Sequence, residues 1–105
     1  MTLKDVTVTK KAVFSHGGKV AQRSVITPEG EMKSLGLMQP GVYRFLAEAP
    51  ETFEVLQGRC RIKIADDQAW TEVQAGEGFA IPAHAHFEIE VEEPLDFIRH
   101  HGKEA

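Results

Sequence analysis

The chain has 105 residues, of which 42% are hydrophobic and 27% are charged, a composition typical of one globular domain. Its 12 basic and 16 acidic side chains give a net charge of −4, which argues against binding nucleic acids or acidic membranes through a basic surface. A single cysteine excludes an internal disulfide, and neither a signal peptide nor a membrane-spanning apolar stretch is present, so we expect a cytoplasmic protein.

The first half of the chain is expected to form short strands. Apolar and polar residues alternate, and no window of helical length repeats every 3.6 residues, which predicts an all-β fold. Residues 1–16 are expected to form an N-terminal arm or peripheral strand. Further strands are expected at 19–26, 35–38 and 42–46. Turn signals separate them at Gly17-Gly18, Thr27-Pro28-Glu29-Gly30 and Gln39-Pro40-Gly41.

The second half continues the same pattern. Strands are expected at 52–57, 59–65, 70–74, 78–82, 86–91 and 95–100. The first two of these are separated only by Gly58, and Asp66-Asp67-Gln68 is expected to form a loop. Turn signals spaced about eight to twelve residues apart favour a β-sandwich or barrel.

The stretch RCRIKI has a firmly determined register. One face of the strand carries Cys60, Ile62 and Ile64, and the other carries Arg59, Arg61 and Lys63. A slip of one residue would bury the basic side chains, so we expect the apolar face to be internal. A buried, inert thiol follows for the cysteine. The basic face is interpreted as solvated, with a phosphate-binding stripe as the alternative.

The histidines near the end of the chain form two groups. His84 and His86 are two residues apart, so an extended strand would point both to one side, opposite the apolar Phe87. With Glu51 as a third ligand they could hold zinc, iron or nickel, or they could lie at the rim or outside of a barrel. The pair His100-His101 is expected to be frayed and solvated near the C-terminus.

Other side chains suggest a binding pocket. Glu51 follows Ala49-Pro50 at the start of a strand, where it could point into a barrel mouth or cap a turn. Arg44 lies in the apolar run VYRFL, so it either reaches the surface or pairs with an acid or a bound anion such as phosphate. Aromatic residues could fill the core or stack on a flat ligand. They are Tyr43, Phe45, Phe53, Phe79, Phe87 and Phe97.

The spacing of a few residues resembles the cupin family. Glu51 and Gly58 in E-TFEVLQ-G, with Gly76 and Pro82 in G-EGFAI-P, resemble the two cupin motifs. The positions where cupins place metal-binding histidines fall near Phe45 and Ala47 and at Phe87. The resemblance implies a single cupin-type β-barrel, or jelly roll (double-stranded β-helix), over residues 1–105, without the usual metal chemistry.

A narrower resemblance covers residues 17–101. The stretches that carry it are Gly18-Lys19-Val20, SLGLM at 34–38, PGVYRF at 40–45, APE at 49–51, VLQG at 55–58, Trp70 and AGEGFAIP at 75–82. Their order and spacing are similar to those of the small bacterial pyrimidine/purine nucleoside phosphorylases. This implies phosphorolysis of purine and pyrimidine nucleosides to free base and (deoxy)ribose 1-phosphate. Inorganic phosphate would be the co-substrate, with no metal or other cofactor, and a homodimer is expected.

Site roles are predicted on that basis. The predicted catalytic residues are Glu51 and His84. Glu51 is expected to bind the ribose hydroxyls, and His84 is expected to donate a proton to the base. Arg44 is expected to bind phosphate. Tyr43 and Phe79 would line the base site, and His86 would contribute to substrate binding. The alternatives are a non-enzymatic cupin that binds a small molecule and a metal-dependent cupin that uses Glu51, His84 and His86.

Overall fold

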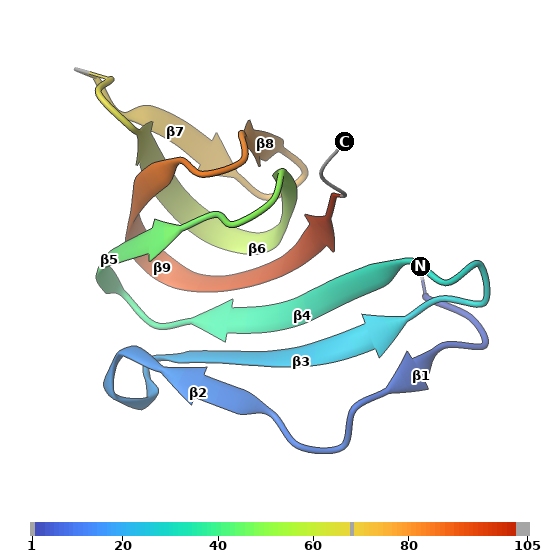
Figure 1. Ribbon diagram of the computed structural model, residues 1–105. Helices are drawn as coiled ribbons and strands as arrows, with labels where there is room; N and C mark the ends of the chain where they lie inside the picture. Colours follow the sequence, from blue (N-terminus) through green and yellow to red (C-terminus); the bar gives the residue numbers. More distant parts are fainter. Residues whose placement is uncertain (1, 68, 103–105) are drawn as a thin grey trace.

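The computed structural model describes residues 2–67 and 69–102, and it confirms the all-β prediction (Figure 1). Within these residues, nine strands form one antiparallel sheet, and the only helical element is the 3₁₀ turn η1 (His16–Gly18). The described residues contain no helix long and apolar enough to cross a membrane. Gln68, part of the predicted loop, lies outside the described residues. The strands are β1 (Thr7–Val8), β2 (Val13–Ser15), β3 (Val20–Ile26), β4 (Met32–Met38), β5 (Gly41–Leu46), β6 (Glu51–Ile64), β7 (Thr71–Gln74), β8 (Gly78–Ile81) and β9 (His86–His101).

The sheet is built around the two long strands, β6 and β9. They pair antiparallel over nearly their whole lengths, from Glu51 opposite His101 to Ile64 opposite Phe87. The first part of β9 also pairs with β5, and its second part pairs with β4. In the same way, β8 and β7 pair with successive parts of β6. Because these ribbons bend together, the sheet curls into an open barrel (Figure 1).

The bend in β6 is centred on Gly58. This residue has a φ of +92°, and a Cβ placed on it would lie 2.3 Å from the carbonyl oxygen of Pro94 in β9. The pairing register shifts between Val55 and Cys60, as in a β-bulge. We predicted separate strands on either side of Gly58, and again for 86–91 and 95–100. Those boundaries were wrong, because β6 and β9 each continue through the bend as one strand.

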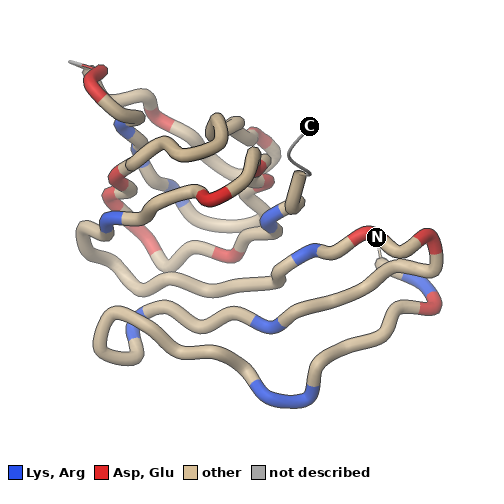
Figure 2. The backbone as a smooth tube through the Cα atoms, viewed as in Figure 1, with Lys and Arg blue, Asp and Glu red and all other residues tan. Residues whose placement is uncertain are grey.

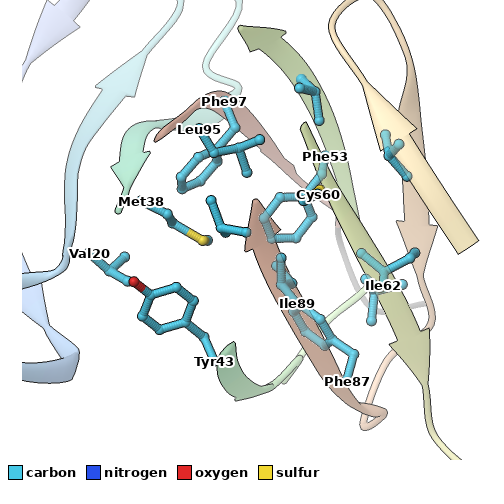
Figure 3. Close-up of a cluster of buried hydrophobic side chains, with 14 of the residues drawn as sticks. Val20, Met38, Tyr43, Phe53, Cys60, Ile62, Phe87, Ile89, Leu95 and Phe97 are labelled. Atoms are coloured by element: carbon cyan, nitrogen blue, oxygen red, sulfur yellow. The ribbon is translucent and has the colours of Figure 1, made fainter. Parts of the chain in front are cut away.

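The barrel interior is filled by aromatic and aliphatic side chains. Phe53, Phe87 and Phe97 meet there with residues from β4 and β5 (Figure 3). The predicted register of RCRIKI is confirmed, because Cys60 is fully buried and Ile62 is 4% exposed. Burial raises the pKa of the Cys60 thiol to about 11, with the nearby Glu92 carboxylate adding to the effect. The thiol therefore stays protonated at neutral pH.

The basic face of β6 meets carboxylates of β9. Arg59 Nε lies 3.1 Å from Glu92, and Arg61 Nε donates to Glu90 at 2.7 Å. Figure 2 shows acidic and basic residues interspersed along the barrel strands. These arginines are thus matched by neighbouring acids, as expected for a solvated outer face.

The N-terminal arm consists of two short strands. Both β1 and β2 pair with β3, which also pairs with β4, so the arm extends the sheet beyond the barrel (Figure 1). On the outer face of this extension, Phe14 is 67% exposed and Leu37 is 56% exposed. Ala21 lies between them in register. The extension therefore presents an apolar surface to its surroundings.

We expect Gly58→Ala to destabilise the protein by at least about 2 kcal/mol, because the new Cβ adds a backbone clash to a left-handed conformation. Gly30→Ala is the matched control. Gly30 has a φ of +86°, and a Cβ added to it would meet no atom within 4 Å, so it isolates the conformational strain, about 1 kcal/mol. Urea unfolding measures both. Equal losses would show that the contact with Pro94 is unimportant.

Candidate active site

One end of the barrel has a polar interior. Along β9, the inward face carries Leu95 and Phe97 and then changes to Arg99 and His101. The pairing places Arg99 between Ser34 of β4 and Phe53 of β6, while His101 is opposite Glu51. Polar side chains from separate strands are thus brought together at this end, which we call the barrel mouth. Its polar members are Gln22, Ser34, Glu51, Arg99 and His101.

The centre of the mouth is a buried ion pair between Glu51 and Arg99. Nε of the arginine donates to Oε1 at 3.1 Å, and Nη2 donates to Oε2 at 2.8 Å. Nη1 donates to the Gln22 side-chain oxygen at 2.7 Å. The Glu51 side chain is only 8% exposed, and that of Arg99 is 21% exposed. A bidentate pair satisfies the carboxylate, whose burial without a partner would be strongly unfavourable.

The C-terminal histidines are ordered parts of β9, so the prediction of a frayed, solvated pair was wrong. His101 Nε2 is hydrogen-bonded to Ser34 Oγ at 2.7 Å. His100 points to the outer face, where Nδ1 lies 2.7 Å from Lys33 Nζ and Nε2 lies 3.2 Å from Glu54 Oε1. Pairing with β4 and β6 on both sides holds the end of β9 in place.

A small cavity lies against the ion pair. Its volume is about 30 Å³, roughly the space of one water molecule. Glu51, Arg99 and Gln22 supply its polar wall, and aromatic rings supply much of the rest. The full lining is Gln22, Met38, Phe45, Leu46, Glu51, Phe53, Phe87 and Arg99. The cavity thus joins a charged polar wall to aromatic rings in a space too small for a sugar or a base.

The structure places Glu51 in the mouth, but the predicted aromatic residues stand behind the cavity wall. Tyr43 is buried, and its hydroxyl donates to the Gln39 carbonyl at 2.6 Å. Phe79 stacks on Phe53, with ring centres 4.8 Å apart. Tyr43 likewise lies beside Phe45, with ring centres 6.5 Å apart. Both residues therefore support rings that line the cavity.

Two other predicted residues lie together outside the barrel. Arg44 and His86 line an outer groove of about 250 Å³, to which Lys63 and Glu88 also contribute. The Arg44 side chain is 84% exposed, and its Nε lies 3.7 Å from Glu88. The groove shares Phe45 and Phe87 with the cavity. The structure thus separates these basic residues from the carboxylate of Glu51, which is buried on the interior side.

His84 lies in the turn before β9. Its φ is +65°, and its backbone N–H donates to the Ala47 carbonyl at 2.6 Å. The strand begins only at His86, so the predicted extended alignment of His84 with His86 was wrong. Phe87 lies on the face opposite His86, as expected, and it is buried.

The metal-dependent alternative requires Glu51, His84 and His86 to converge. Glu51 faces the interior and pairs with Arg99, whereas both histidines are exposed. Among residues 2–67 and 69–102, no group of three or more histidine, cysteine, aspartate or glutamate residues is arranged to hold a metal ion. The proposed ligand set is therefore not assembled in this structure.

Sequence reasoning did not identify Arg99, Gln22 or His101 as site residues. The sequence feature that could have identified Arg99 is its spacing, because it follows Leu95 and Phe97 at every second position and so shares their inward face of β9. An arginine in phase with core residues needs a buried partner. The identity of that partner depends on the pairing of β9 with β6, which brings Glu51 close.

Comparison with solved structures identifies the class of fold. A protein of unknown function from Acinetobacter sp. ADP1 superposes with a TM-score of 0.93 at 34% identity, over 96% of this chain and 98% of that one. An RmlC-like cupin from Shewanella frigidimarina superposes with a TM-score of 0.67 over 85% of this chain and 79% of that one. Because the two sequences are only 15% identical, this similarity shows a shared fold and nothing more. The predicted cupin-type β-barrel is confirmed.

Sequence comparison then identifies the family. The model of the family described as pyrimidine/purine nucleoside phosphorylase matches residues 10–101. A relative named pyrimidine/purine nucleoside phosphorylase, from Methylococcus capsulatus, is 38% identical over 98 residues, covering 93% of this chain and 95% of the relative. The chain belongs to the pyrimidine/purine nucleoside phosphorylase family, as the resemblance predicted.

The stability of the fold should depend on the charge of His101. Burial lowers the pKa of His101, the Arg99 guanidinium and His100 lower it further, and Glu51 opposes them. The unfolded chain therefore takes up a proton at this site more readily than the folded chain. We expect the free energy of unfolding to decrease as pH falls from about 6.5, the ordinary histidine pKa, towards the lower folded value.

His101→Gln should remove the part of the decrease in unfolding free energy that comes from protonating His101. The glutamine side chain can still form a hydrogen bond with Ser34. Urea unfolding between about pH 7 and pH 5 measures the effect. His86→Gln is the control for losing an exposed imidazole. A pH dependence that is the same in His101→Gln as in the unmodified protein would contradict the assignment.

Proposed function

We propose that this protein catalyses phosphorolysis of purine and pyrimidine nucleosides at the barrel mouth. A phosphate oxygen forms a bond to C1′ of the sugar while the bond from C1′ to the base nitrogen breaks. The electron pair of that bond goes to the base, which takes up a proton. The products are the free base and (deoxy)ribose 1-phosphate. Family membership supports this reaction, and the buried Glu51–Arg99 pair beside an aromatic wall is the observation that carries it.

Glu51 and Arg99 suit the two polar parts of the substrates. The Glu51 carboxylate can accept hydrogen bonds from the ribose hydroxyls, as predicted from the sequence. The Arg99 guanidinium presents a planar fork that matches phosphate geometry, and its positive charge can hold the phosphate anion that attacks C1′. We therefore propose Arg99 for phosphate in place of Arg44, whose side chain is 84% exposed on the outer face.

The aromatic wall fits broad base specificity. Phe45 and Phe87 stack with ring centres 5.5 Å apart and line the cavity beside Phe53. Rings of this kind can stack on purines and pyrimidines without reading their edges. The cavity holds about one water, so a nucleoside must displace side chains at the mouth, where Leu46 is 52% exposed. In this proposal phosphate is the co-substrate and no other cofactor is required.

His84 remains the proposed donor to the leaving base. Its turn is tied to Ala47, the residue after Leu46 on the cavity wall. The imidazole is exposed, so a substrate entering past Leu46 would meet it without prior rearrangement of the core. General acid assistance to a leaving group contributes about 10²–10⁴-fold in rate.

We expect purified protein to release uracil from uridine and adenine from adenosine only when phosphate is present. Arg99→Lys should lower kcat/KM by about 100-fold or more, because lysine keeps the charge but loses the planar fork. Base release measured by chromatography tests this. Arg44→Lys is the matched control and should stay within about twofold, since its exposed pair with Glu88 contributes little.

The reverse ranking of the two lysine variants would move the phosphate site to the outer groove. Nucleoside binding with no base release above a blank would favour the non-enzymatic alternative. A loss of activity in Arg99→Lys supports the proposal only if this variant is folded, which circular dichroism and a cooperative thermal transition establish.

We also propose that the protein is a homodimer joined through the outer face of β2, β3 and β4. Phe14 and Leu37 are largely exposed there, and Leu35 is 37% exposed. With Ala12 and Ala21, the two leucines contribute to a shallow hollow of about 240 Å³. Gln22, Arg23 and Asp96 also line the hollow. A mostly apolar surface with such a polar margin is typical of an interface between subunits.

Leu37→Glu should convert a dimer into a monomer of about the 11.7 kDa chain mass, because it places a charge in the apolar patch. Val42→Glu is the matched control, because Val42 is 57% exposed on β5, away from the patch, against 56% for Leu37. Light scattering coupled to size-exclusion chromatography distinguishes the states. A monomeric unmodified protein at micromolar concentration would rule out the interface.

A further inference from the structure

We propose that Glu51 withholds Arg99 from phosphate until a nucleoside engages Glu51, so that the nucleoside binds first and phosphate second. This order rests on the proposed function, because it assigns ribose to the carboxylate and phosphate to the guanidinium. It adds that the two sites share one ion pair and are therefore coupled.

Every nitrogen of the Arg99 guanidinium is already engaged. Nε and Nη2 bind the carboxylate of Glu51, and Nη1 binds the oxygen of Gln22. The flat face of the group lies over Phe53, with Cζ 5.7 Å from the ring centre. Of the five N–H bonds, one on Nη1 and one on Nη2 remain, and the fork formed by Nε and Nη2 is occupied by the carboxylate. A bidentate contact to phosphate through Nε and Nη2 therefore requires the ion pair to open.

The charge of Glu51 acts in the same direction. Its side chain is 8% exposed, so its negative charge is poorly screened by water. A phosphate anion approaching Arg99 would meet this carboxylate next to a guanidinium that is already neutralised. Removing Arg99 from Glu51 without a replacement would also leave a buried carboxylate without hydrogen bonds, which is strongly unfavourable.

The hydroxyls of a ribose supply that replacement. They donate hydrogen bonds to the carboxylate and bring no charge of their own. Once the ribose hydroxyls donate hydrogen bonds to Glu51, the guanidinium of Arg99 can turn towards phosphate, and the buried carboxylate keeps its hydrogen bonds. Gln22 retains Nη1 and is a positioning residue, because it limits how far the guanidinium can move. The sugar therefore acts as the ligand that opens the phosphate site.

Phosphate binding in the absence of turnover tests the order directly. The probe is inorganic phosphate, titrated by calorimetry into the unmodified protein with and without saturating pseudouridine. This nucleoside has a carbon–carbon glycosidic bond that phosphate does not cleave. We expect pseudouridine to tighten phosphate binding by about tenfold or more, and phosphate to tighten pseudouridine binding by the same factor.

Variants of Glu51 give the second arm. Glu51→Gln removes the charge that holds Arg99, so phosphate should bind this variant alone about tenfold more tightly than it binds the unmodified protein. Pseudouridine should then add little further tightening. Glu54→Gln is the matched control, because Glu54 lies on the outer face of the same strand, where it contacts His100. It should behave like the unmodified protein.

The proposal is overturned if phosphate binds the unmodified protein equally well with and without pseudouridine. This comparison needs no substitution, so it holds even if Glu51→Gln does not fold. Base release together with uncoupled binding would remove the inference and leave the proposed function intact. Coupled binding without base release from any nucleoside would remove the proposed function and leave the shared ion pair as a ligand-binding device.

Discussion

The structure depends on a common corner in its long strands. At Gly58 the backbone of β6 approaches the Pro94 carbonyl of β9 more closely than any side chain would allow. The neighbouring ribbons change partners at the same level, where β4 gives way to β5 and β8 to β7. Because the strands bend together, a continuous sheet encloses an interior. The corner also determines which residues of β6 and β9 meet at the mouth.

At that mouth, the fold buries charge where it could have buried hydrocarbon. Glu51 and Arg99 lie on the inward faces of β6 and β9, in line with buried apolar side chains such as Phe53 and Phe97. Replacing a buried ion pair with apolar residues is often neutral or stabilising, so the pair is weak evidence for stability. Its placement against an aromatic cavity is the reason we propose it as the substrate site. The same low-dielectric surroundings that make the pair strong would make its exchange for substrate selective.

Much of the fold was predictable from local patterns, whereas the site was only partly so. The alternation around Cys60 indicated which face of β6 is internal, and Glu51 was expected to be able to point into a barrel mouth. Arg99 was missed because its role depends on a partner 48 positions away in the sequence. His84 was placed on a strand because its spacing to His86 fits an extended chain, but a left-handed turn intervenes. The spacing pattern carries no information about that turn.

The sequence by itself determined the all-β class, the inward and outward faces of its strands, and the family resemblance over residues 17–101. These properties depend on side-chain alternation and on short motifs, which are local along the chain. Only the tertiary structure decided which polar residues share a site. Cross-strand pairing brings Gln22, Glu51 and Arg99 together at the mouth and leaves Arg44 outside. Such contacts are set by register between distant strands, and register depends on how the whole barrel closes around its core.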